Sequence, residues 1–182
     1  MEIIDKTVRW KGSFMSAVEI RYRDARGVVR TWEAVERVGI GGIVVMVAVT
    51  PSGAVLLEKQ FRPPLGRSVI ELPAGLVDPG ESMEAAAQRE LIEETGWSAG
   101  KMRFLAEGPV STGASAEVLR AFLCTELEHI GKSGGDDNEI IEVIEVPLDN
   151  VHEYLVETHR SGTLVDLKVY GLLELARRAL AA

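Results

Sequence analysis

Residues that could do chemistry concentrate in one short stretch, positions 75–97, where Glu90, Glu93 and Glu94 follow Arg89. On a helix, at about 100° per residue, Glu90 and Glu94 lie about 40° apart and Glu93 lies about 60° to the other side, so the three carboxylates share one face. Carboxylates at this spacing repel one another, and the C-terminal end of a helix also disfavours anions. Two explanations fit: a bound divalent cation such as Mg²⁺, which takes oxygen ligands, or a solvated acidic face.

The spacing of nine residues in this stretch favours the cation. They match the constrained positions of the pattern G-x5-E-x7-R-E-U-x-E-E-x-G-U, where U is apolar: Gly75, Glu81, Arg89, Glu90, Leu91, Glu93, Glu94, Gly96 and Trp97. This is the Nudix box, so the chain resembles the Nudix hydrolase superfamily. Residues 30–37, 58–64 and 70–75 also resemble its ADP-ribose and nucleoside-diphosphate-sugar pyrophosphatase branch, and the resemblance covers roughly residues 12–179.

This resemblance implies an α/β fold, the Nudix α/β/α sandwich with a mixed sheet. It implies an N-terminal antiparallel β segment, residues 1–38, exchanged between the subunits of a homodimer, and a Nudix hydrolase domain over residues 39–182. The implied reaction is Mg²⁺- or Mn²⁺-dependent hydrolysis of the diphosphate of ADP-ribose or a related nucleoside-diphosphate sugar, giving a nucleoside monophosphate and a sugar phosphate. Two alternatives remain: a Nudix hydrolase of oxidised nucleoside diphosphates or dinucleotides, and a sensor that binds ADP-ribose without cleaving it.

The resemblance also assigns the metal ligands. By position, Glu90 and Glu94 correspond to the principal ligands, joined by the backbone carbonyl of Ala74. Glu93 corresponds to an auxiliary ligand or hydrogen-bond partner, and Arg89, four residues before it, can pair with it. We therefore place Arg89 and Glu93 among the catalytic residues.

A base must take the proton of the attacking water. A loop rich in Gly and Asp, residues 131–138, ends at Glu139, and it resembles the loop from which this branch supplies its catalytic carboxylate. Glu139 is the first choice for the base and Asp137 the alternative, because an alignment across a loop can slide by two residues. A solvated acidic loop is the other interpretation of these residues.

Substrate-binding residues fall in the N-terminal part. Arg37 and Arg62 resemble the arginines that hold the diphosphate and the terminal ribose, a role suited to a forked donor. Trp32 and Phe14 resemble the aromatic pair that sandwiches the adenine, one from each subunit, although each could instead be an ordinary strand aromatic. Residues 111–113 read Ser-Thr-Gly where relatives that prefer ADP-ribose often carry Ser-Pro-Gly, which leaves the choice of sugar nucleotide open.

The elements that position these residues follow from apolar periodicity and turn residues. They predict a hairpin within residues 16–38, a second and more buried hairpin from strands 43–49 and 54–60, and further strands at 68–72, 102–106, 118–127 and 140–146. Ser82 is predicted to cap a helix that runs to about residue 95, where Gly96 ends it. A helix begins at Asp149, and Thr163 with Asp166 resembles a capping box for a final helix that ends near residue 181.

Composition excludes several classes of protein. The 182 residues suit one domain, and the net charge of −8 disfavours a nucleic-acid polymer as partner. Residues 1–69 carry 11 Lys and Arg against 7 Asp and Glu, whereas residues 70–182 carry 9 Lys and Arg against 21 Asp and Glu. This uneven distribution is typical of solvated faces of differing sign, or of a basic part that binds an anion beside an acidic part that binds cations. A single cysteine, Cys124, rules out an internal disulfide. The longest apolar run, 43–49, is too short to span a membrane, and the N-terminus lacks the pattern of a leader, so we expect a cytoplasmic protein.

Overall fold

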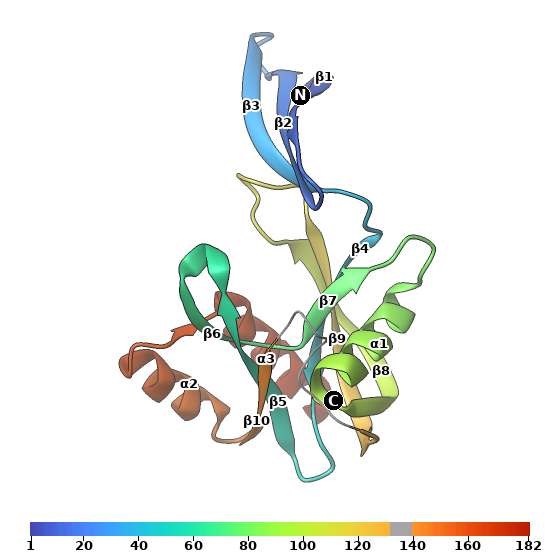
Figure 1. Cartoon of the computed structure of the whole chain (residues 1–182), viewed down its shortest axis with the longest axis vertical. Helices are drawn as coiled ribbons and strands as arrows, with labels where there is room; N and C mark the ends of the chain where they lie inside the picture. The colour runs from blue at the N-terminus through green and yellow to red at the C-terminus, as the bar shows by residue number, and fades with distance from the viewer. Residues whose placement is uncertain (132–139) are drawn as a thin grey trace.

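A computed structural model describes residues 1–131 and 140–182 of the chain (Figure 1). In chain order the elements are β1 (Glu2–Lys11), β2 (Met15–Arg23), β3 (Val29–Arg37), β4 (Gly42–Ala48), β5 (Ala54–Arg62), the 3₁₀ helix η1 (Pro63–Leu65), β6 (Arg67–Glu71), β7 (Ala74–Val77), α1 (Met83–Thr95), β8 (Trp97–Pro109), β9 (Val118–His129), β10 (Ile141–Pro147), α2 (Val151–Arg160), β11 (Leu164–Val165) and α3 (Leu167–Ala181).

The first three strands form an antiparallel sheet in the order β1-β2-β3, which stands away from the rest of the chain in Figure 1. The predicted hairpin within residues 16–38 is confirmed as β2 and β3. Its turn closes where the N–H of Gly27 donates to the carbonyl of Asp24 at 3.0 Å, and Gly27 has a φ of 80°. Strand β1 lies almost wholly on the surface. It falls within the β segment of residues 1–38 that the resemblance implies, although apolar periodicity places the first strand only from residue 16.

The other strands form two mixed sheets, in the orders β7-β4-β9-β8 and β10-β5-β6-β11. The pairs β4–β9 and β6–β11 are parallel and the others are antiparallel. Side chains of β4 alternate between two cores, because successive residues of a strand point to opposite faces. Val44, Met46 and Ala48 lie in a core with Leu91 of α1, while Val45, Val47 and Val49 lie in a core with residues of α2 and α3, such as Leu155 and Leu173. The predicted α/β/α arrangement with a mixed sheet is thereby confirmed.

The predicted hairpin of residues 43–49 and 54–60 is wrong. Strand β4 pairs with β7 and β9, whereas β5 pairs with β6 and β10, and an isolated bridge joins Val49, just beyond β4, to Val55 of β5. Each strand is buried on both faces, so its apolar run does not reveal which partners its edges take. Strand β8 also extends well beyond the predicted residues 102–106.

Helix ends agree with the sequence at α1 and differ at α3. The Ser82 hydroxyl accepts from the N–H of Ala85 at 3.1 Å, and Gly96, with a φ of 74°, ends α1. At α3 the cap is Asp166, whose carboxylate accepts from the N–H of Lys168 at 3.0 Å. The capping box that begins at Thr163 is wrong, because strand β11 lies between Thr163 and the helix and pairs with β6. Among the helices that the structure describes, each falls short of the length and apolar character needed to cross a membrane.

Candidate active site

A cavity of about 470 Å³ lies between the ends of several elements, and its volume is typical of small-molecule sites. Its walls come from the end of β3, strands β4 to β7, α1, the segment before β9, and the start of α3. It brings together seven of the residues predicted from sequence to form the site: Arg37, Arg62, Ala74, Arg89, Glu90, Glu93 and Glu94. Segments that lie far apart in the sequence therefore meet around one space.

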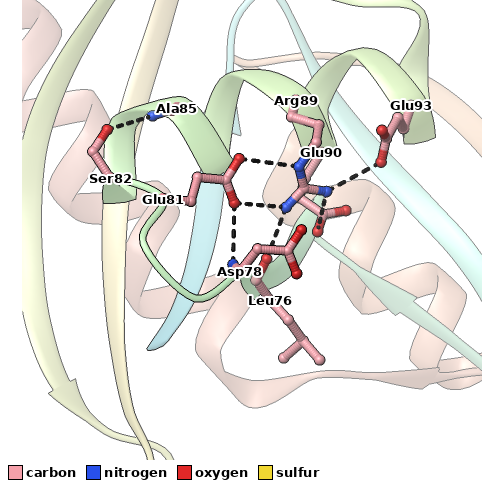
Figure 2. Close-up of polar contacts among 8 residues, drawn as sticks. All are labelled: Leu76, Asp78, Glu81, Ser82, Ala85, Arg89, Glu90 and Glu93. Atoms are coloured by element: carbon pink, nitrogen blue, oxygen red, sulfur yellow. Dashed lines mark hydrogen bonds and ion pairs between the residues drawn. The ribbon is translucent and has the colours of Figure 1, made fainter. Parts of the chain in front are cut away.

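Arg89 joins the carboxylates of α1 to the loop that precedes the helix (Figure 2). Its Nη1 contacts Glu90 at 2.8 Å and Glu93 at 3.2 Å, and its Nη2 donates to the carbonyl of Leu76 at 2.9 Å. Nε and Nη2 bind the two oxygens of Glu81 at 3.1 and 3.0 Å. These bonds, first of all that to Glu81, raise the pKa of Arg89, so the guanidinium is a fixed positive charge among acidic groups.

Glu81 fixes the loop onto the helix. Besides its paired bonds to Arg89, it accepts from the backbone N–H of Asp78 at 3.1 Å. The Arg89 guanidinium, helped by the Asp78 N–H, holds the pKa of Glu81 below its usual value. Glu81 does not line the cavity, so its contacts hold the loop and the helix together.

Glu90 and Glu94 both contact strand β7, by different means. A Cβ on Gly75 would lie 1.9 Å from Cδ of Glu90. The Glu90 carboxylate therefore occupies the space that a side chain at position 75 would fill. Glu94 is buried, and its Oε2 accepts from the N–H of Ala74 at 3.0 Å. The structure thus brings Ala74, Glu90 and Glu94 together, while the side chain of Glu93 is about half exposed at 53%.

These donors suit a hard divalent cation. Within residues 1–131 and 140–182, no three His, Cys, Asp or Glu side chains are arranged as a ready-made set of metal ligands. Glu90 is paired with Arg89, and Glu94 is bonded to Ala74. The donor set nevertheless fits Mg²⁺, because Mg²⁺ is usually held by one or two carboxylates together with substrate phosphates and water.

Two arginines on other walls are held by carboxylates. Arg37 Nε lies 2.6 Å from Oε1 of Glu117, and Arg62 Nε lies 2.6 Å from Oε2 of Glu71. Both arginine side chains are at least a third exposed, so solvent or a ligand can reach them. A phosphate that binds either arginine must share it with its carboxylate partner or displace that partner.

The two predicted stacking aromatics lie outside the cavity, and none of the described residues that line it is aromatic. The indole N–H of Trp32 donates to the carbonyl of Gly113 at 2.9 Å, and the N–H of Val35 donates to Ala114 at 2.8 Å, so the loop of residues 111–115 is fastened to β3. Phe14 is 80% exposed. A single chain therefore does not bring Phe14 and Trp32 to the carboxylates of α1.

Comparison with known proteins decides the family, because the NUDIX domain matches residues 41–165. The chain is a member of the Nudix family. It is 36% identical over 166 residues to an uncharacterized Nudix hydrolase of Schizosaccharomyces pombe, covering 85% of this chain and 81% of that protein. An ADP-ribose pyrophosphatase of Bacillus subtilis is 41% identical over 110 residues, 60% of each chain, and an ADP-sugar pyrophosphatase of Mus musculus is 33% identical over 186 residues, 88% of this chain and 80% of that one.

A solved structure supports the same assignment at the level of fold. The crystal structure of an ADP compounds hydrolase superimposes on this Nudix chain with a TM-score of 0.81, covering 98% of this chain and 93% of the other at 21% identity. The fold is therefore that of a Nudix hydrolase. The family match and the similar pyrophosphatases show that the chain is a hydrolase.

The sequence patterns assigned no site role to three charged residues that line the cavity of this Nudix hydrolase: Glu71, Asp166 and Lys168. Glu71 stands in a stretch that carries the resemblance, but its bond to Arg62 follows only once β5 and β6 are known to pair. Asp166 was noticed only as part of a helix cap. The two candidate bases, Asp137 and Glu139, lie outside the residues that the structure describes, so their assignment stays a prediction.

Proposed function

We propose that this Nudix hydrolase cleaves the diphosphate of ADP-ribose or a closely related nucleoside-diphosphate sugar, giving a nucleoside monophosphate and a sugar phosphate. The observation that carries the proposal is one cavity in which the carboxylates of Glu90 and Glu94 share the lining with the guanidinium groups of Arg37 and Arg62. Carboxylates can hold cations, and forked guanidinium donors suit phosphate oxygens. The names of the similar Bacillus subtilis and Mus musculus pyrophosphatases agree with this chemistry.

Mg²⁺ or Mn²⁺ is the proposed cofactor, held by Glu90, Glu94 and the carbonyl of Ala74, with Glu93 as an auxiliary ligand. When bound, such an ion neutralises phosphate charge and lowers the pKa of a coordinated water. Arg89 keeps Glu90 and Glu93 in place through the contacts shown in Figure 2, so we assign it a positioning role.

The chain's own groups account for the remaining roles. Between them, Arg37 and Arg62 hold the diphosphate and the terminal ribose and so orient the substrate for in-line attack by water. Either Glu139 or Asp137 takes the proton of that water. This choice rests on the resemblance alone.

We further propose a homodimer in which the adenine stacks between Trp32 and Phe14 of different subunits. Support comes from the exposed aromatic side chains of the N-terminal segment, Trp10 at 60%, Phe14 at 80% and Trp32 at 49%, and from a cavity lining that lacks aromatics among the described residues. Exchange of residues 1–38, a cytoplasmic location and the absence of a nucleic-acid polymer partner remain predictions from sequence.

Mixing two inactive variants tests the shared site. A Phe14→Ala chain supplies intact carboxylates, and a Glu94→Gln chain supplies an intact Phe14. If the site is shared, mixed dimers recover up to about a quarter of the wild-type activity, because half of the dimers are mixed and each has one complete site. Mixtures no more active than the separate variants contradict the shared clamp, and elution of the wild type as a monomer contradicts the dimer.

The substrate is tested by incubating the protein and Mg²⁺ in parallel with ADP-ribose, GDP-mannose, UDP-glucose, a dinucleotide and an oxidised nucleoside diphosphate. Products are resolved by chromatography, and kcat/KM values are compared because their ratio measures discrimination. We expect AMP and ribose phosphate from ADP-ribose with the highest kcat/KM. A higher value for the dinucleotide or the oxidised nucleotide contradicts the proposal, as does tight binding of ADP-ribose without product.

A further inference from the structure

The start of α3 forms one wall of the cavity and carries two charged side chains toward it, Asp166 and Lys168. The ammonium of Lys168 is ion-paired with the Asp166 carboxylate, and the side chains are 38% and 21% exposed. The backbone fixes both residues. The N–H of Asp166 donates to the carbonyl of Ile70 at 2.9 Å, and the Asp166 carboxylate accepts from the N–H of Lys168 at 3.0 Å. A ligand that enters this side of the cavity meets a positioned donor beside a positioned acceptor.

A second pair lies close to the first. Glu71 follows Ile70 directly on β6, and it binds Arg62 of β5. This end of the cavity therefore carries two cations and two carboxylates, whereas the α1 side carries three carboxylates, two of them paired with the single guanidinium of Arg89. The end near α3 is thus electrically balanced and rich in both donors and acceptors.

That composition suits a neutral group with several hydroxyls. Each hydroxyl both donates and accepts, so it can bond a carboxylate and a cation at the same time. A phosphate would face the Asp166 and Glu71 carboxylates, and a base would find no aromatic side chain among the described lining residues. With the diphosphate at the carboxylates of α1, one end of the substrate extends toward the N-terminal sheet and the other toward α3.

We propose that Asp166 and Lys168 bind the hydroxyls of the sugar beyond the diphosphate, and that they set the preference of this hydrolase for substrates that carry such a sugar. This inference rests on the proposed function, because it takes the diphosphate to lie at Glu90 and Glu94. It adds two specificity-determining residues on an element that lies outside the Nudix box.

The test compares ADP-ribose with the methyl ester of ADP, which keeps the diphosphate and lacks the second sugar. Lys168→Met removes the ammonium at similar length. Asp166→Asn removes the charge but keeps an oxygen that can cap α3. Leu167→Ala is the matched control, since Leu167 lies in the same turn, is 82% exposed and does not line the cavity.

We expect each of the two test variants to lower kcat/KM for ADP-ribose by about ten-fold, mainly through KM, and to leave the methyl ester within about two-fold of wild type. The control should change neither. The inference is overturned if kcat/KM falls equally for both substrates or falls for neither. It is also overturned if the wild type does not prefer ADP-ribose to the methyl ester.

Equilibrium dialysis of the same two compounds separates this inference from the proposed function. Suppose that the wild type binds ADP-ribose more tightly than the methyl ester but cleaves neither compound, and that Lys168→Met binds the two equally. This result supports the sugar contact and contradicts the hydrolytic function. Hydrolysis of ADP-ribose with unchanged selectivity in Lys168→Met supports the function and contradicts the sugar contact.

Discussion

The backbone of Gly75 leaves the space that the carboxylate of Glu90 occupies: a Cβ at position 75 would lie 1.9 Å from Cδ and 2.2 Å from Cγ of Glu90. The glycine is required here by close approach and not by a left-handed backbone, since Gly75 is not among the residues with positive φ. The first position of the Nudix box thus has a direct steric link to one of its carboxylates.

Gly75→Ala should therefore displace the Glu90 side chain and lower kcat by roughly a hundred-fold, because misplacing a reacting group by about 1 Å has an effect of that order. Stability should change little, since Glu90 can turn toward solvent. Steady-state kinetics and thermal unfolding check both. Gly108→Ala is the control, because a Cβ there meets no atom within 4 Å, and full activity in Gly75→Ala would refute the steric link.

Arg89→Lys should lower the free energy of unfolding by about 1–3 kcal/mol, since a lysine cannot bind both Glu81 oxygens and the Leu76 carbonyl at once. Urea denaturation measures this. Arg178→Lys on α3 is a matched control, because the Arg178 side chain is 77% exposed and pairs with Glu174 one turn away; its effect should stay below about 0.5 kcal/mol. Equal effects of the two substitutions would show that the Arg89 contacts contribute little.

Acid should weaken the fold in part through Glu81. Arg89, and then the Asp78 N–H, hold the pKa of Glu81 in the folded state below its ordinary value of 4.5. The stabilisation from this carboxylate is therefore complete above that value and is lost as the pH falls through the lower, folded-state pKa. Urea unfolding of wild type and Glu81→Gln should differ most near neutral pH and converge in acid, whereas a difference that grows in acid would reverse the predicted sign.

Cys124 should be inert in the folded protein. It is fully buried in the core beneath α1, and burial raises the pKa of its thiol to about 12. Because the thiolate is the reactive species, a thiol reagent at neutral pH should label the chain only after unfolding. Rapid labelling of the native protein would place Cys124 outside the core.

Short sequence patterns predicted where helices and strands lie better than they predicted which strands pair with each other. The cap at Ser82, the stop at Gly96 and the carboxylate spacing on α1 each depend on a few neighbouring residues, and the structure agrees with all three. The pairing of β4 and the role of β11 depend on strands distant in the sequence, which an apolar run does not identify.

In the site, too, local patterns identified some residues, while others enter the cavity only through the pairing of distant strands. The box located Glu90 and Glu94, and the resemblance located Arg37 and Arg62, all of which line the cavity. Lys168 escaped notice because it enters the cavity only through the pairing of β11 with β6, which places the start of α3 beside Ile70.

If the carboxylates of α1 carry metal-dependent hydrolysis, the most direct test is the turnover of ADP-ribose by wild type and Glu94→Gln in Mg²⁺ and in EDTA. The glutamine can still accept the Ala74 N–H, so the fold should persist. Glu84→Gln, on an exposed position of the same helix, is the control. We predict that EDTA abolishes wild-type turnover and that Glu94→Gln lowers kcat by roughly a hundred-fold or more while Glu84→Gln stays near wild type. Undiminished turnover by a folded Glu94→Gln variant would contradict this role of the α1 carboxylates.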